Sequence, residues 1–352
     1  MKEKFKNVEF LRFIFAIFIV FYHFRSIIKG TLEQYVPGIT HCDICVEFFF
    51  IMAGFFLFSN LKTNTDTVKF ALKRFFRLAP LIWFSTVCFL VLSLISKFHF
   101  SFDNHILRML LLSNIGFSPK VETTVIHWFI PVLFWCSLFY FYISKIFDKK
   151  YLNLIMWLIV IFSCSFALNY MNFTTGGQTK NIYYVINIGV MRGLAAIGVG
   201  YFISMLYNSD FLKTCSKKMQ IVISSIEIYL VTFLAHYLLF TNKIPGKTPF
   251  LYVVMFSVLF FLFLRKKGII SKLLDNNLFY MLGASSYAIY VMHPVVSIYF
   301  KHLVFKHNTA LINQHALVYI LIVGISAIVV GILTHYFVEK PINKWISSKQ
   351  IF

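Results

Sequence analysis

Apolar runs long enough to cross a membrane recur along this chain, and they limit its fold more than any other feature. A membrane-spanning helix needs about 20 apolar residues, because its length must match the hydrocarbon core. The sequence predicts ten such segments, at 8–27, 43–60, 79–97, 125–146, 151–170, 183–207, 219–240, 249–264, 278–300 and 313–337. We therefore expect an all-α, polytopic integral membrane protein with a single transmembrane domain over residues 1–352.

The composition excludes a soluble protein. Only 13% of the residues are charged and 59% are hydrophobic, whereas a soluble domain has about a quarter of its residues charged. The net charge of +20 is also found in nucleic-acid-binding proteins, but here the basic residues form short clusters between apolar segments. That pattern sets the orientation of a membrane protein, so we expect no nucleic-acid partner. Cys42 and Cys45 stand as one isolated pair, so we expect no metal.

The basic residues also predict the orientation of the chain. If the N-terminus is cytoplasmic, the cytoplasmic segments hold about twice as many Lys and Arg residues as the outer segments. Both termini are then cytoplasmic. The basic segment 66–78 has helical spacing and predicts an amphipathic helix on the cytoplasmic membrane surface. Segment 103–116 is too short to span and is either re-entrant or interfacial, and we expect the first apolar segment to be a retained helix, because no small-residue cleavage site follows it.

Two ionisable residues lie inside the first apolar segment. Arg12 and His23 are eleven residues apart, which is close to three helical turns, so they share one face of a helix about 16 Å apart along its axis. Taken singly, Arg12 could extend to the headgroups and His23 could lie at the outer interface. Two such residues on one stripe instead indicate a face that is turned to the protein interior or to a water-filled cavity.

Further polar residues are predicted at the depth of His23, in the outer half of the membrane. They are Glu47, His127, Arg192, His236 and His293. We expect Glu47 to lie beside His23 and fix its tautomer, although a lone interfacial glutamate is the alternative. One or two residues of this cluster are structural, and His236 is the first candidate.

A second group of basic residues is predicted at the cytoplasmic side. Arg74 and Arg77 are spaced i and i+3, so they share a helix face. Ordinary positive-inside charge and acidic-lipid binding explain Lys73 well. With Arg12 nearby, the two arginines match a phosphate clamp, because a guanidinium pairs with two phosphate oxygens at once.

The order of these motifs resembles the membrane-bound acyltransferase 3 family over most of the chain. The matching parts are the Arg-x10-His of the first segment, "VEFFFIMAGFFL", "KRFFRLAPLIW", "SYAIYVMHPVV" and "HYFVEKPINKW". The resemblance implies acyl-CoA, usually acetyl-CoA, as donor, a glycan as acceptor and a bacterial inner membrane as location. It also implies that Arg12 and His23 are essential and that Arg74 and Arg77 contact the donor. The segment "HWFIPVLFW" lacks the glutamate that many members carry there.

From these observations we expect an O-acetyltransferase that modifies a hydroxyl of a cell-envelope polysaccharide or exopolysaccharide, such as lipopolysaccharide. The predicted catalytic residues are His23 and Glu47, with His23 as the base or as a covalent acyl carrier. The predicted donor site is Arg12, Arg74 and Arg77. The predicted acceptor site is His127, Trp128, Arg192 and His293, where Trp128 either stacks on the sugar or packs in the core.

A transporter or flippase for an envelope glycan is the alternative function. Polar residues within spans serve transport as well. Two features of the sequence count against it: no pair of inverted halves is detectable, and the arginine clamp is predicted on one face only.

Overall fold

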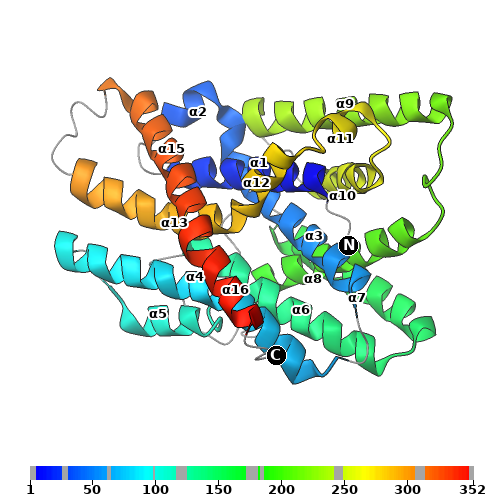
Figure 1. Ribbon diagram of the computed structural model, residues 1–352, viewed down its shortest axis with the longest axis horizontal. Coiled ribbons are helices and arrows are strands. Elements are labelled where there is room, and N and C mark those ends of the chain that lie inside the picture. The colour runs from blue at the N-terminus through cyan, green and yellow to red at the C-terminus, as the bar shows by residue number, and fades with distance from the viewer. Residues whose placement is uncertain are drawn as a thin grey trace.

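The computed structural model describes residues 5–25, 31–61, 65–97, 100–115, 125–171, 181–182, 186–241, 249–305 and 314–348. Within these residues almost every element is a helix, as expected. In the described part of the chain, eight helices are long and apolar enough to cross a membrane, one further candidate is a bent pair, and α10 is a shorter apolar helix. Each of the ten predicted segments therefore contains an apolar helix, although positions 26–27, 183–185 and 313 lie outside the described residues. Figure 1 shows most of the long helices lying side by side.

The elements follow in chain order, with η1 and η2 as 3₁₀-helices and η3 and η5 as π-helices. They are α1 (Lys6–Phe24), α2 (Thr31–Tyr35), η1 (Pro37–Ile44), α3 (Cys45–Ser59), α4 (Thr67–Ser96), α5 (Phe102–Met109), η2 (Val125–Trp128), α6 (Phe129–Ile146), α7 (Lys149–Met171), β1 (Asn181–Ile182), β2 (Ile186–Asn187), α8 (Ile188–Asn208), α9 (Lys217–Phe240), α10 (Pro249–Arg265), α11 (Ile269–Leu273), α12 (Asn277–Ala284), α13 (Ser286–Tyr299), η3 (Phe300–Val304), α15 (Ala316–Thr334), η5 (His335–Glu339) and α16 (Lys340–Ser348). The strands β1 and β2 pair antiparallel, with Asn181 opposite Asn187.

The predicted surface helix 66–78 and the predicted span 79–97 are in fact one helix, α4, of 30 residues. The break expected between residues 78 and 79 is absent, because the helix continues through Pro80. A proline inside a membrane helix is tolerated where neighbouring helices supply hydrogen bonds to the backbone around it. Pro80 itself removes the helical donor to the carbonyl of Phe76, four residues earlier. Close to the proline, the hydroxyl of Tyr287 on α13 donates to the carbonyl of Leu78 at 2.7 Å. The arginines of the predicted surface helix are thus rigidly joined to a membrane span.

The predicted span 278–300 is bent. It consists of α12 and α13, whose axes differ by 46°. The bend falls in a Gly/Ser-rich stretch, which is a common site of helix kinks. A Cβ at Gly283 would overlap the backbone of Glu9, so the glycine lets α12 cross α1 in close contact. The bend therefore sends α13 along a course different from that of α12.

The last predicted span, 313–337, ends too early. Helix α15 continues through the π-helix η5 into α16, as far as Ser348. Hydropathy falls after the apolar part, but helical geometry does not require apolar residues, so the helix extends beyond the apolar run. Figure 1 shows α15 and α16 as one long rod.

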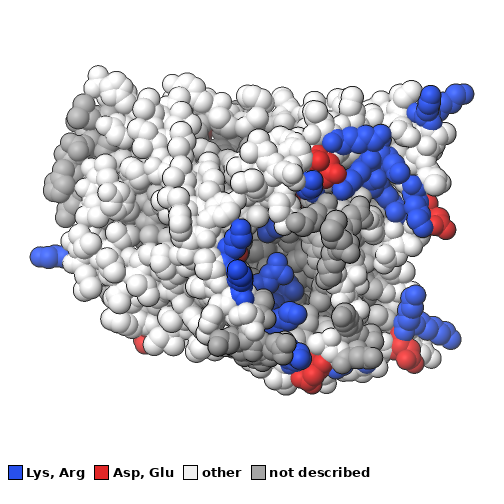
Figure 2. Space-filling view, viewed as in Figure 1, with Lys and Arg blue, Asp and Glu red and all other residues white. Residues whose placement is uncertain are grey.

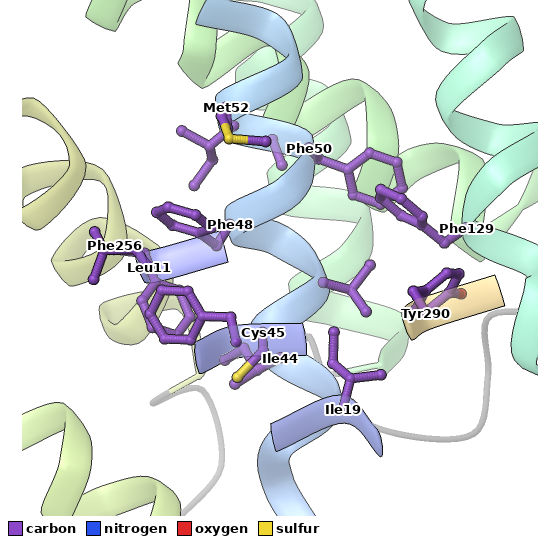
Figure 3. Packing of buried hydrophobic residues seen from close by; sticks show 14 of the residues in the cluster. Leu11, Ile19, Ile44, Cys45, Phe48, Phe50, Met52, Phe129, Phe256 and Tyr290 are labelled. Atoms are coloured by element: carbon purple, nitrogen blue, oxygen red, sulfur yellow. The ribbon is translucent and has the colours of Figure 1, made fainter. Parts of the chain in front are cut away.

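Helix α3 lies at the centre of the core and packs most closely against α8. Cβ atoms at Gly54 and Gly200 would overlap the backbone of the facing helix, so glycine at both positions allows the two backbones to touch. Buried aromatic rings lie on both sides of α3, with Phe48 facing α10 and Phe50 facing Phe129 of α6 (Figure 3). This tight contact sets the positions of polar residues on α3 and α8.

Candidate active site

Three of the histidines predicted in the outer half come together in the structure. The rings of His23 on α1 and His293 on α13 stack, with centroids 5.3 Å apart and an angle of 24° between the planes. His127 reaches the same part of α13, where its Nε2 lies 3.1 Å from the carbonyl oxygen of Val291. Three helices that are far apart in the sequence therefore form one histidine centre.

The hydrogen bond of His127 determines its tautomer. A carbonyl oxygen can only accept, so Nε2 carries the proton and Nδ1 of the neutral ring holds a lone pair. His127 is 1% exposed, and no described residue bonds to Nδ1. His293 is fully buried beside it, and the backbone of Ile289 and Tyr290 lies close to its ring. Buried polar atoms are nearly always bonded, so this centre is equipped to receive polar groups of a substrate.

Glu47 forms a bidentate ion pair with Arg192. Arg192 Nε donates to Glu47 Oε1 at 2.5 Å, and Arg192 Nη2 donates to Oε2 at 2.9 Å. Both side chains are buried, at 0% and 1% exposure. A bidentate pair of this kind occupies both carboxylate oxygens with a charge-assisted bond each. We therefore replace the expected pairing of Glu47 with His23 by the observed ion pair between α3 and α8.

Two predicted acceptor residues, Arg192 and Trp128, contact each other. The guanidinium of Arg192 lies over the Trp128 ring, 5.0 Å from its centroid. Trp128 is 4% exposed and also packs near Phe50, at 6.0 Å. In this arrangement the packing alternative for Trp128 is favoured over stacking on a sugar.

His236 lies apart from the histidine centre. Its side chain is on the exposed face of α9, with its ring 5.7 Å from that of Phe240. It was the first candidate for a structural role, and its position supplies a useful control for mutagenesis.

The three predicted donor-site arginines converge at the other end of α1. Arg12 pairs with Glu9 at 2.7 Å. Arg77 lies close enough to both side chains to interact with them electrostatically. Arg74 lies next to Arg77 on α4, and the two positive charges repel each other. Figure 2 shows Lys and Arg side chains gathered around a hollow, near the position of α16 in Figure 1. The Nε atoms of Arg12 and Arg74 have no hydrogen-bond partner among the described residues, so the group fits an anionic ligand.

Glu339 and His335 are site residues that sequence reasoning missed. They lie in the π-helix η5, where His335 Nδ1 is 2.7 Å from Glu339 Oε2, and the charge of Glu339 acts on Arg77. Helix turns of this type occur frequently at functional sites. In the sequence both residues lie in the segment "HYFVEKPINKW", where the i, i+4 spacing of His335 and Glu339 places them on one helix face.

Among the described residues, no group of three or more His, Cys, Asp and Glu side chains is arranged to hold a metal ion. The site thus consists of a buried histidine centre and an arginine-lined mouth, joined by helix α1. An apolar bundle of long helices of this kind is that of an integral membrane protein.

The comparison with protein families identifies the class of chemistry. Residues 5–336, nearly the whole chain, match the family described as an acyltransferase domain, Acyl_transf_3. The protein belongs to this family and is an acyltransferase, a transferase enzyme, as the resemblance implied. No curated relative and no solved structure matches the chain.

Proposed function

We propose that this acyltransferase moves an acyl group, acetyl in the first instance, from cytoplasmic acyl-CoA to a hydroxyl of a cell-envelope polysaccharide. One observation carries the proposal: α1 is a single uninterrupted helix that bears Arg12 in the arginine mouth and His23 in the histidine centre. The two residues are about 16 Å apart along the helix axis. A donor with a phosphate-rich head and a long thin arm matches this spacing.

The arginine mouth binds the head of the donor. Arg12, Arg74 and Arg77 supply planar guanidinium groups, which match phosphate oxygens in geometry and charge. The continuous helix α4 holds Arg74 and Arg77 in register with the bundle. The acyl-CoA thioester then extends along α1 toward His23.

The histidine centre carries out the transfer. His23 takes the proton of the sugar hydroxyl as the hydroxyl oxygen attacks the thioester carbonyl, and the proton then passes to the departing CoA thiolate. A positioned base of this kind contributes about 10²- to 10⁴-fold in rate. A covalent acyl-histidine would divide the same transfer into two steps. The stacked ring of His293 positions His23, and the lone pair of His127 Nδ1 is available to accept a hydrogen bond from a hydroxyl of the acceptor.

The proposal is tested by transfer of radiolabelled acetyl from acetyl-CoA to membrane glycan. The variants are His23→Ala and Arg12→Ala, with His236→Ala and Lys73→Ala as matched controls, because both control side chains are exposed. We expect label with the wild type and with both controls, and a loss of about 100-fold or more with His23→Ala. Undiminished label with His23→Ala would remove the proposed base. Absence of label with altered glycan export would favour the transporter.

We further propose that the protein resides in a bacterial inner membrane with both termini in the cytoplasm. The excess of basic residues in the predicted cytoplasmic segments supports this orientation. A reporter that is active only in the cytoplasm, fused after the C-terminus, tests it. Loss of this reporter's activity, together with activity of a second reporter that works only outside the cytoplasm at the same position, would reverse the orientation. It would also place the arginine mouth away from cytoplasmic CoA.

A further inference from the structure

Helix α5 turns back along α4. His105, near the start of α5, lies against Phe89, with ring centroids 5.8 Å apart. Met109, at the end of α5, accepts a hydrogen bond from the indole of Trp83, which comes six residues earlier in α4 than Phe89. The two helices are therefore antiparallel.

The segment after α5 is held in a fixed conformation. Trp83 Nε1 donates to the carbonyl of Met109 at 3.0 Å, and Trp135 Nε1 donates to the carbonyl of Leu111 at 2.8 Å. Leu111 and Asn114 adopt left-handed backbone conformations, with φ of 56° and 57°. Such conformations are unfavourable for leucine and persist only where surrounding contacts impose them. The position of α5 is thus determined by specific bonds from α4 and α6.

This helix carries a buried arginine, Arg108, whose two terminal nitrogens have no hydrogen-bond partner in the part of the chain that the structure describes. Arg108 is 1% exposed, and neither Nη1 nor Nη2 bonds to any described residue. His105 Nδ1 is likewise without a bond among them, while its ring stacks on Phe100 at 3.9 Å. Burying an uncompensated guanidinium is costly, so the charge requires an anion to offset it.

Arg108 retains its charge under physiological conditions. Burial lowers the pKa of Arg108 to about 10, and burial with the nearby Arg108 charge lowers the pKa of His105 to about 3. Near neutral pH the pair therefore consists of a cation and a neutral imidazole. A neutral imidazole adds a hydrogen bond without adding repulsion.

The arginine lies beside the histidine centre. The ring of Phe89 is 5.8 Å from the guanidinium carbon of Arg108 and 6.4 Å from the ring of His127. Phe89 also packs with Met292 and Val295, which flank His293 on α13. The charge of Arg108 acts on His127. An anion bound by Arg108 would thus lie next to the reacting groups and remote from the arginine mouth at the other end of α1.

We propose that Arg108, assisted by His105, binds an anionic group of the substrate, a carboxylate or a phosphate, next to the hydroxyl that is acylated. The inference rests on the proposed function and assigns the substrate class: either the acceptor is an acidic or phosphorylated sugar, or the acyl group carries a carboxylate of its own, as a succinyl group does. Both sources present the oxyanion that a buried guanidinium recognises.

Binding to the purified protein in nanodiscs, followed by tryptophan fluorescence, tests the inference without turnover. The acceptor probes are glucuronate and glucose 1-phosphate, compared with neutral glucose. The donor probes are succinyl-CoA, compared with acetyl-CoA. The variants are Arg108→Gln and the charge-retaining Arg108→Lys, with Lys97→Gln as the control that removes an exposed positive charge at the end of α4.

We expect Arg108→Gln to weaken binding of one class of anionic probe by about tenfold or more, while its neutral counterpart binds unchanged. Loss for glucuronate or glucose 1-phosphate assigns the anion to the acceptor, and loss for succinyl-CoA alone assigns it to the acyl group. Arg108→Lys should retain part of the affinity, and Lys97→Gln all of it. Equal binding of every probe to wild type and a folded Arg108→Gln variant would overturn the inference.

The label-transfer assay separates this inference from the function on which it rests. Anion binding that depends on Arg108, in a protein that transfers no acyl group from any acyl-CoA, would refute the proposed donor and leave the anion site in place. Transfer from acetyl-CoA with no preference for anionic substrates would support the proposed donor and refute the anion site.

Discussion

The imidazoles of His23 and His293 stack face to face across α1 and α13, with centroids 5.3 Å apart. The two helices are far apart in the chain. The bend between α12 and α13 changes the direction of α13, which packs against α1. In the proposed mechanism the two rings act as one unit, one as the base and the other as the group that orients it.

We expect His23→Ala and His293→Ala to be non-additive. Residues that act as a unit lose most of their contribution when either one is removed. Each single variant should lower the initial rate of label transfer by about 100-fold or more, and the double variant should fall little further. A double variant whose loss equals the product of the two single losses would show that the rings act independently.

Removing one member of the Glu47–Arg192 pair should destabilise the protein strongly. Glu47→Ala or Arg192→Ala leaves an uncompensated buried charge, which costs about 3–5 kcal/mol. The double variant Glu47→Leu/Arg192→Met, which removes both charges, should recover most of the stability. Unfolding in mixed micelles measures the difference. A double variant less stable than either single variant would contradict an ion-pair role.

Gly54→Ala should separate α3 from α8. The added Cβ would overlap the backbone carbonyl of Ile197, and two helix backbones cannot yield to it without moving apart. We expect a lower midpoint of thermal unfolding and reduced acyl transfer, because the same contact aligns Glu47 with Arg192. Ala53→Ser, at the neighbouring half-buried position, is the control and should leave both quantities close to those of the wild type.

Asp66 should stabilise the start of α4 in a pH-dependent way. Its Oδ2 accepts from the Lys69 backbone N–H at 3.0 Å, which lowers the pKa of the carboxyl below its ordinary value of 3.8. A depressed pKa means that the stabilisation is fully present above pH 3.8 and is lost as the pH falls through the lower folded value.

The measurement for Asp66 is the unfolding midpoint of wild type and Asp66→Ala between pH 7 and pH 3. The wild type should be more stable at neutral pH, and the difference should shrink in acid. Asp66→Asn retains an N-cap acceptor and should show little loss at neutral pH. A difference that grows as the pH falls would be the wrong sign for this cap.

Local properties of the sequence determined the membrane fold and the two zones of the site. An apolar run of span length requires a helix wherever it crosses hydrocarbon, since backbone groups have no other hydrogen-bond partners there. Helical periodicity alone aligned Arg12 with His23 and Arg74 with Arg77, because residues within one helix keep their spacing in any tertiary context.

Tertiary structure decided which polar residues meet. The depth of Glu47 was predictable, but its partner could have been any group at that level, and the glycine contact between α3 and α8 selects Arg192. The bond from Tyr287 of α13 to the backbone of α4 near Pro80 is likewise a tertiary contact, and the position of Arg108 depends on indoles of α4 and α6. These contacts join segments far apart in the chain, so neither hydropathy nor helical spacing could reveal them.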